Sequence, residues 1–385
     1  MKVTFISCFL SPHQIPFSNE MYKQLGDNYK FISTDILGEH RIKMGWDTSD
    51  KFPYEIKTYE SNSNLEKAIK LANESDVVII GSASDKFIEE RLKKGKLTFK
   101  YSERLYKEGL ALKRIPRAIC GSWLHHGRFQ KYPIYMLCAS AYTARDLAIF
   151  NNYKNRTYKW GYFPEFKEYN IKSLLELKKN SKVEILWVGR IINCKHAEDA
   201  VKIAINLNKE GYDFNLNIIG TGECEGYLKD LIIKNKIEDK VKLLGAIHTD
   251  DVRQYMEKAN IFLFTSDFNE GWGAVLNEAM NSACAVVASH AIGSVPFLLK
   301  HGENGLIYRY SDMDDFYKNV KILIDDRNLQ LKLGENAYHT LKNSWNEKEA
   351  TKRFIELSKN LLLGRDTEFT DGPCSKAKIL KNDWL

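Results

Sequence analysis

The sequence predicts an α/β protein built from two doubly wound domains, each with a parallel sheet. Its 385 residues exceed one ordinary core, because domains of about 150 residues are typical. From residue 183 onward, apolar runs alternate with helical patterns, which indicates right-handed crossovers in a parallel sheet. A stretch rich in aromatic residues, with Gly and Pro, at 159–165 marks the boundary between the two halves.

The elements follow from the spacing of apolar residues. Continuous apolar runs predict strands in the second half at 183–188, 214–219, 241–244, 261–264 and 284–288. Apolar residues three or four positions apart predict helices at 198–208, 227–233, 252–256, 274–280 and 316–324. The first half is less regular, and we expect strands there at 3–7, 77–80 and 97–101.

The composition excludes several classes of protein. Hydrophobic residues make up 44% of the chain and charged residues 28%, which is typical of a globular protein and not of a disordered chain. No run approaches the roughly 18 consecutive apolar residues of a membrane span. The seven cysteines are scattered and odd in number, which favours reduced thiols in a cytoplasmic protein.

The net charge of +7 is concentrated in one segment. Residues 91–131 hold twelve Lys and Arg against only Glu103 and Glu108. Such a basic segment suggests an anionic partner such as phosphate, a lipid surface or nucleic acid. The alternative is a solvated, lysine-rich face.

Two loops that follow strands carry residues suited to a nucleotide. Arg190 follows the first strand of the second half, and Lys195 stands five residues further, before a helix. A guanidinium and an ammonium beside a helix N-terminus can hold a diphosphate, although two exposed basic residues in a loop are the alternative. The next strand ends at Gly220-Thr221-Gly222, where glycines allow a nucleotide to approach the backbone.

The loop after strand 261–264 is the most informative. Glu270 closes it, glycines flank Trp272, and a helix that carries Glu278 follows. Two carboxylates in this setting can accept hydrogen bonds from the hydroxyls of a nucleotide sugar. Glutamates eight residues apart also occur by chance. The prediction of a sugar-binding site therefore depends on the flanking strand, glycines and helix.

Four motifs together resemble the nucleotide-sugar domain of GT-B glycosyltransferases of family 4. They are G-R-x4-K at 189–195, G-x-G at 220–222, E-G-W-G-A-V-L-N-E-A-M at 270–280 and N-G-L-I-Y at 304–308. The third is similar to the E-x7-E signature of the retaining members. The resemblance implies a GT-B fold, with two Rossmann-like domains facing across a cleft. We expect an acceptor domain at 1–165 and a nucleotide-sugar domain at 166–343. A helix at 344–364 would cross back to the first domain, and a polar, poorly packed tail would follow at 365–385.

The resemblance also implies roles for single residues. Arg190 and Lys195 would hold the diphosphate, and Glu270 would contact the donor sugar. Glu278 would bind the ribose, and the loop at Ala246 and Ile247 would face the base. The implied donor-binding residues are Gly189, Gly220, Gly222, Ala246, Ile247, Gly271, Trp272, Gly273, Ala274 and Glu278.

The first half departs from the family pattern. Family members often have a glycine-rich loop after the first strand and a histidine near the reacting sugar. Here the first strand is followed by residues 11–16 without glycine, and strand 97–101 is followed by Glu103. We expect Glu103 to take the histidine's place as a catalytic residue, with a surface salt bridge to Arg104 or Lys107 as the alternative. His13 and Gln14 are candidates for the acceptor side.

We expect no metal and no cofactor. The D-x-D pattern at 312–314 opens an amphipathic helix, where acidic residues suit a helix cap, and the His and Cys residues show no ligand spacing. The resemblance implies a retaining, metal-independent transfer from a nucleotide-diphosphate sugar, with UDP favoured, to a saccharide or polyprenyl-diphosphate-linked acceptor. Bacterial capsule or O-antigen assembly is the expected pathway.

Two other functions stay open. The basic segment 91–131 could belong to a non-catalytic module that binds nucleic acid, although no reader motif accompanies it. GT-B proteins also include sugar-nucleotide epimerases and phosphorylases. For the transferase, we expect peripheral contact with the inner face of an anionic membrane, with Lys93, Lys94 and Lys96 at the headgroups.

Overall fold

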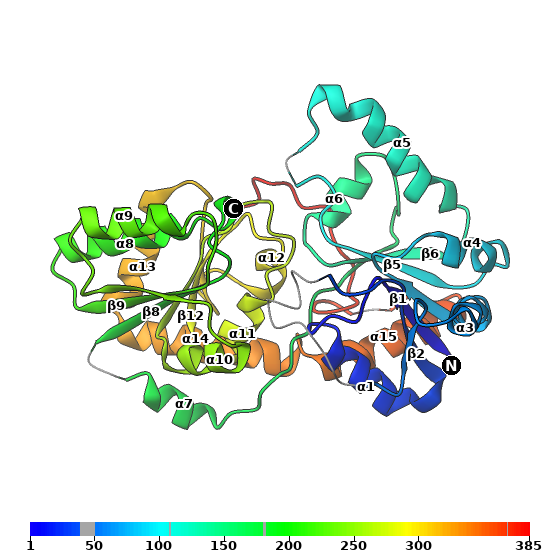
Figure 1. Cartoon of the computed structure of the whole chain (residues 1–385), viewed down its shortest axis with the longest axis horizontal. Coiled ribbons are helices and arrows are strands. Elements are labelled where there is room, and N and C mark those ends of the chain that lie inside the picture. Colours follow the sequence, from blue (N-terminus) through cyan, green and yellow to red (C-terminus); the bar gives the residue numbers. More distant parts are fainter. Residues whose placement is uncertain (39–50, 108, 180–181, 368) are drawn as a thin grey trace. The chain divides into compact units, whose positions relative to one another are not determined.

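The computed structural model describes residues 1–38, 51–107, 109–179, 182–367 and 369–385. Glu108, which enters the charge of the basic segment, lies outside these ranges. The chain forms two compact units (Figure 1). Unit 1 comprises Met1–Glu165 and Ser344–Asn382, and unit 2 comprises Phe166–Asn343 and Asp383–Leu385.

Unit 1 contains a parallel sheet with the strand order β3-β2-β1-β4-β5-β6-β7. Its strands are β1 (Val3–Ser7), β2 (Tyr29–Ser33), β3 (Glu55–Lys57), β4 (Val77–Ile80), β5 (Thr98–Ser102), β6 (Ile134–Cys138) and β7 (Thr157–Lys159). The central strand β4 is four β-branched residues, all buried, as a strand covered on both faces requires. Its helices include α1 (Ile15–Leu25), α3 (Asn62–Glu74), α4 (Lys86–Lys93), α5 (Ile115–His125) and α6 (Thr143–Ala148).

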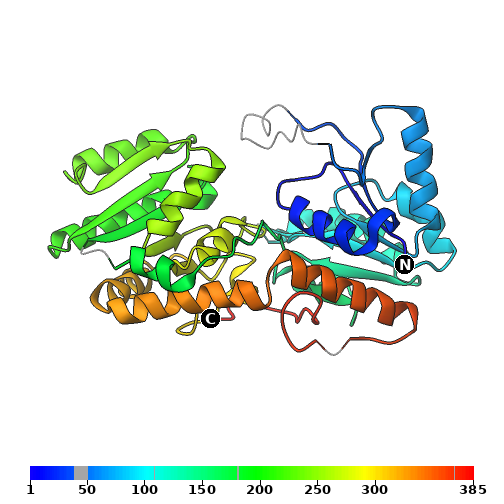
Figure 2. The same ribbon diagram turned by 90° about the horizontal axis from the view of Figure 1, so that it is seen from below.

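Helix α15 (Glu347–Leu362) packs on unit 1, where it contacts α1 and lies along the strands (Figure 2). Asn346 caps it by accepting a hydrogen bond from the amide of Glu349. The ring of Phe354 lies 5.2 Å from that of Phe99 on β5 and 5.8 Å from that of Trp160. A buried aromatic cluster therefore holds this C-terminal helix.

The segment after α15 is better packed than we expect from its polar sequence. Cys374 is fully buried, and Ser375 accepts a hydrogen bond from the amide of Lys159 on β7. The expectation of a poorly packed tail is therefore wrong for this part of it. Backbone pairing with an edge strand, which side-chain polarity does not reveal, is the reason.

Unit 2 contains a second parallel sheet, with the strand order β10-β9-β8-β11-β12-β13. Its strands are β8 (Val183–Val188), β9 (Phe214–Ile219), β10 (Val241–Gly245), β11 (Ile261–Phe264), β12 (Ala285–Ser289) and β13 (Leu306–Tyr308). Its helices are α7 (Ile171–Leu177), α8 (Ala197–Lys209), α9 (Glu225–Lys234), α10 (Thr249–Lys258), α11 (Val275–Asn281), α12 (Val295–Leu298), α13 (Met313–Asp325) and α14 (Arg327–Asn343).

Among the helices of unit 2, α8 contacts α9 and α13, α11 contacts α10 and α14, and α13 contacts α14. The predicted parallel sheets with helical crossovers are confirmed in both units. Asp312 accepts a hydrogen bond from the amide of Asp315 and caps α13, as the D-x-D segment predicts. Within the described ranges, no helix combines the length and the apolar character that crossing a bilayer requires.

Candidate functional site

The predicted donor residues of unit 2 lie in loops at one edge of its sheet. Strands β8, β9 and β11 run parallel, so the loops that follow them meet at their carboxyl ends. Arg190 follows β8, Gly220 follows β9 and Glu270 lies in the loop after β11. The order β9-β8-β11 also makes this the point where the sheet topology reverses, which is where ligands bind in such folds.

Glycines in two of these loops are required by the close approach of the loops to each other. A Cβ at Gly220 would lie 1.8 Å from the carbonyl oxygen of Gly189, and one at Gly222 would lie 2.2 Å from that of Ile191. The amide of Ile191 also donates to the carbonyl of Thr221 at 2.9 Å. The sequence analysis assigns these glycines to the approach of a nucleotide, and the structure shows that the neighbouring loop already demands them.

Lys195 and Glu270 form an ion pair that joins the loop after β8 to the loop after β11. Both side chains are largely withdrawn from solvent, with exposed fractions of 17% and 13%. The hydroxyl of Ser266 donates to the same Glu270 oxygen at 3.2 Å. Two residues that were predicted separately from the sequence are therefore paired with each other.

His196, the next residue, extends this network and was not among the predicted residues. Its Nδ1 lies 2.9 Å from Glu198, and its Nε2 lies 3.5 Å from Asp267 and 3.1 Å from the hydroxyl of Tyr310. Hydrogen bonds to Asp267 and Glu198 raise the pKa of the imidazole to about 9. The ring is therefore a cation at neutral pH, beside Lys195.

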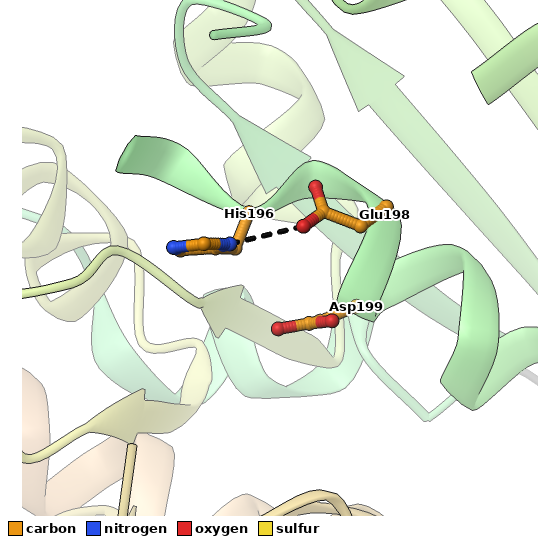
Figure 3. A group of neighbouring side chains, drawn as sticks. All are labelled: His196, Glu198 and Asp199. Carbon is orange, nitrogen blue, oxygen red and sulfur yellow. Dashed lines mark hydrogen bonds and ion pairs between the residues drawn. The ribbon is translucent and has the colours of Figure 1, made fainter. Parts of the chain in front are cut away.

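His196, Glu198 and Asp199 also bring their ligand atoms within 4.8 Å of one another (Figure 3). Such a group is close enough to hold a metal ion, and the sequence analysis did not foresee it. The same atoms are engaged within the protein, however, because His196 pairs with Glu198 and Asp199 pairs with Lys202 at 2.7 Å. The cluster is therefore an ion-pair network.

The side chain of Trp272, one of the predicted donor-binding residues, is fully buried. Its indole Nε1 donates to the side chain of Asn277 at 2.9 Å, and its ring lies 6.3 Å from that of Phe297. The side chain is therefore a core residue, and only its backbone can face a ligand. Gly273 next to it has φ +79°, and a Cβ there would lie 2.3 Å from the ring of Phe264.

Glu278 lies on α11, which begins at Val275, after Ala274 as its N-cap. Burial raises the pKa of its carboxyl, and the charge of Arg253 opposes this shift. Arg253 donates to the backbone carbonyl of Glu278 at 3.1 Å. Among the residues that the structure describes, no hydrogen bond or ion pair joins Glu278 to Glu270.

The remaining donor candidates differ in exposure. Arg190 and Ala246 are exposed, Ile247 is half-buried and Gly271 is buried. The amide of Gly220 donates to the carbonyl of Gly245 at 2.8 Å, which places the loop of Ala246 and Ile247 beside the G-x-G loop.

In unit 1, Tyr162 connects two residues that the sequence analysis names separately. Its hydroxyl donates to Glu103 at 2.5 Å, and its ring stacks on His13 with the centroids 5.6 Å apart. Burial lowers the pKa of His13 to about 4, so its imidazole is neutral at pH 7. Lys107 also donates to Glu103 at 3.3 Å, which is one of the two salt bridges considered from the sequence.

Arg104, the other partner considered from the sequence, has a different ion pair. Arg104 lies 3.6 Å from Asp146 instead, and both side chains are almost fully buried. Gln14 is buried as well and accepts hydrogen bonds from the amide and hydroxyl of Ser11 at 3.2 and 3.1 Å. Gln14 therefore shapes the turn before α1, because its side-chain oxygen is already engaged there.

Residues 172–340, which lie within unit 2, match the family of glycosyl transferases group 1. An uncharacterised glycosyltransferase of Haemophilus influenzae is 32% identical over 171 residues, which cover 44% of this chain and 48% of that protein. The N-acetylgalactosamine-N,N'-diacetylbacillosaminyl-diphospho-undecaprenol 4-alpha-N-acetylgalactosaminyltransferase of Campylobacter jejuni is 30% identical over 146 residues, 38% of each chain. The matched segments thus span half or less of these curated relatives.

The solved structure of Anabaena HepE in complex with UDP has the same fold. It aligns with a TM-score of 0.68 and 14% identity over 92% of this chain and 99% of that one. The two-sheet GT-B architecture expected from the sequence is thereby confirmed. In residues 172–340, the chain carries the sequence pattern of glycosyl transferases group 1 on this fold.

Proposed function

We propose that the protein is a glycosyltransferase whose donor is a nucleoside-diphosphate sugar, with a UDP-sugar as the favoured donor. The observation that carries the proposal is the Lys195–Glu270 ion pair at the carboxyl ends of β8 and β11. It lies within the segment that matches glycosyl transferases group 1, and the structural neighbour HepE is described in complex with UDP.

Arg190 and Lys195 stabilise the leaving group in this proposal. As the bond between the anomeric carbon and the diphosphate oxygen breaks, negative charge develops on that oxygen. A guanidinium and an ammonium placed there stabilise the charge more in the transition state than in the ground state. The bond to the acceptor oxygen forms on the same face, and the acceptor proton passes to the departing phosphate oxygen, so the anomeric configuration is retained.

Glu270 changes partner in this sequence of events. In the structure its carboxylate pairs with Lys195 and accepts a hydrogen bond from Ser266. When a diphosphate pairs with Lys195 in place of Glu270, the carboxylate of Glu270 can accept hydrogen bonds from hydroxyls of the donor sugar. The positive charge needed for leaving-group departure is supplied by side chains, and we propose that the reaction requires no metal ion.

For the acceptor we propose a saccharide, free or linked to a polyprenyl diphosphate, in the cytoplasmic assembly of a bacterial surface polysaccharide such as capsule or O-antigen. The relative from Campylobacter jejuni is named for a diphospho-undecaprenol acceptor, which supports the lipid-linked form. The cluster of His13, Tyr162 and Glu103 is the proposed acceptor side, with Glu103 as its proposed catalytic residue.

The test is donor turnover in Glu270→Gln. We expect release of nucleoside diphosphate from a panel of UDP- and GDP-sugars to fall by about two orders of magnitude or more, since one preorganised polar contact to the transition state has that effect. Glu210→Gln is the matched control, because Glu210 also pairs with a lysine, Lys321, but on an exposed surface. Turnover by Glu270→Gln equal to that of the wild type rules out the proposed role.

A further inference from the structure

Helix α5 (Ile115–His125) presents its apolar side chains to solvent. Ile119 is 50% exposed, Trp123 63% and Leu124 45%. Pro116 and Cys120 are exposed as well. At 100° per residue these five side chains fall on one broad face of the helix. Helix α5 lies at the periphery of unit 1 (Figure 1). A surface helix of a globular protein normally turns such a face toward the core.

The opposite face of α5 is small and polar. Ser122 is the buried residue of this helix, and its hydroxyl accepts a hydrogen bond from the side chain of Asn152 at 2.7 Å. The helix is therefore attached to unit 1 by a polar contact, while its large apolar side chains are exposed to solvent. An exposed apolar patch of this kind marks a surface that binds a partner or a membrane.

The charge around α5 identifies the kind of partner. Residues 109–131 contain five Lys and Arg and no Asp or Glu. Lys113, Arg114 and Arg117 are exposed at the beginning of the helix. The face is thus apolar with a basic rim, which is the pattern of helices that lie in the interface of an anionic membrane.

Other basic residues of the segment 91–131 do not contribute to a surface. Arg91 is fully buried and donates to the backbone carbonyl of Leu97, and Lys100 is buried and pairs with Asp85 at 2.6 Å. Lys93 and Lys94 are exposed, but each lies within 4 Å of Glu90. The headgroup contacts expected from the sequence at Lys93 and Lys94 are therefore weaker candidates than those around α5.

We propose that α5 docks unit 1 on an anionic lipid bilayer, with Ile119, Trp123 and Leu124 inserted at the level of the headgroups and the basic residues on lipid phosphates. A second copy of the chain fits this face less well, since a two-fold contact would oppose the same basic rims. The proposal is independent of the donor chemistry, because the assay below contains neither donor nor acceptor.

The experiment is cosedimentation of the full chain with vesicles. We expect binding to phosphatidylcholine vesicles that contain about a third phosphatidylglycerol, weakened by salt, and little binding to phosphatidylcholine alone. Ile119→Asp/Trp123→Asp should reduce the partition coefficient at least about tenfold, because two apolar side chains no longer insert. Lys113→Glu/Arg117→Glu should reduce it similarly and flatten its salt dependence.

Two controls isolate the helix. Ile69→Asp changes a residue of α3 that is 46% exposed in the same unit, and Lys93→Glu/Lys94→Glu makes the same charge change on α4. Both should bind vesicles like the wild type. Unchanged unfolding temperatures show that all variants fold, which we expect because every substituted side chain is at least partly exposed.

Three results would overturn the proposal. One is equal binding to neutral and anionic vesicles, and another is unchanged binding by Ile119→Asp/Trp123→Asp. The third is a wild type that does not bind anionic vesicles; a dimer that this double variant abolishes would then show that a second copy covers the face instead.

Discussion

His196 and Asp267 lie opposite each other, with 3.5 Å between the imidazole Nε2 and the carboxylate. The backbone amide of Asp267 also donates to the carbonyl of Cys194 at 3.0 Å. His196 itself has a left-handed backbone, with φ +49°, which a non-glycine residue adopts only at some cost. Side-chain and backbone contacts together therefore fix the loop that carries Lys195 against the loop that carries Glu270.

This network predicts a stability that falls at alkaline pH. The pKa of His196 is raised from 6.5 to about 9 in the folded protein. Its pairs with Asp267 and Glu198 thus contribute fully below about pH 6.5 and are lost as the pH rises through 9. We expect the free energy of unfolding to drop by about 2 kcal/mol across this window, given the partial exposure of the ring. Urea unfolding at a series of pH values measures it.

His196→Asn tests the assignment, since asparagine tolerates the left-handed backbone but does not titrate. The alkaline slope should become flatter in this variant and stay unchanged in the control His339→Asn, at an exposed histidine. A slope that survives in His196→Asn would assign it to other groups.

Gly222→Ala should disturb the loops that meet beside β8 and β9. Its new Cβ would lie 2.2 Å from a backbone oxygen, so the chain must shift, and we expect a loss of about 2 kcal/mol or more in unfolding free energy. Gly226→Ala, in the first turn of α9 with open space around it, should be neutral or stabilising by up to about 1 kcal/mol. Chemical denaturation of both variants gives the comparison, and equal stabilities would contradict the packing described here.

Trp272→Ala should destabilise the protein by about 3–5 kcal/mol, because it empties a fully buried site and leaves Asn277 without its indole donor. Trp123→Ala removes an equally large side chain that is 63% exposed, and we expect a change within about 1 kcal/mol. Similar losses in the two variants would show that Trp272 is not the core residue that the structure places there.

The sequence predicted the strands of unit 2 well because they are buried on both faces and form unbroken apolar runs. Strand β8 begins and ends where the apolar run 183–188 does, and helix α13 extends the expected 316–324 by one turn at its N-terminus. Strands β2, β3, β6, β7 and β13 were not predicted. Strands β3, β7 and β13 have three residues each at an edge of a sheet, too short for an apolar pattern. Strands β2 and β6 have five residues each and lie inside the sheet of unit 1, where the first half of the sequence is less regular.

Spacing reveals which residues stand in which loop but not which loops touch. Lys195 and Glu270 were both named from the sequence, yet their pairing depends on β8 and β11 being neighbours. His196 and Tyr162 were missed because their importance lies in partners 71 and 59 residues away, Asp267 and Glu103. The burial of the Trp272 ring was not predicted, because the flanking glycines indicate an open backbone and not where the side chain lies.

The central claim is that the Lys195 site binds a nucleoside diphosphate, and unfolding in the presence of UDP tests it most directly. At about 100 times its Kd, UDP should add about 2.7 kcal/mol to the stability of the wild type. Lys195→Met should lose most of this gain, while Lys321→Met, at an exposed lysine paired with Glu210, should keep it. Stabilisation of Lys195→Met equal to that of the wild type, or no stabilisation of the wild type by any of UDP, GDP, ADP and CDP, would contradict the account.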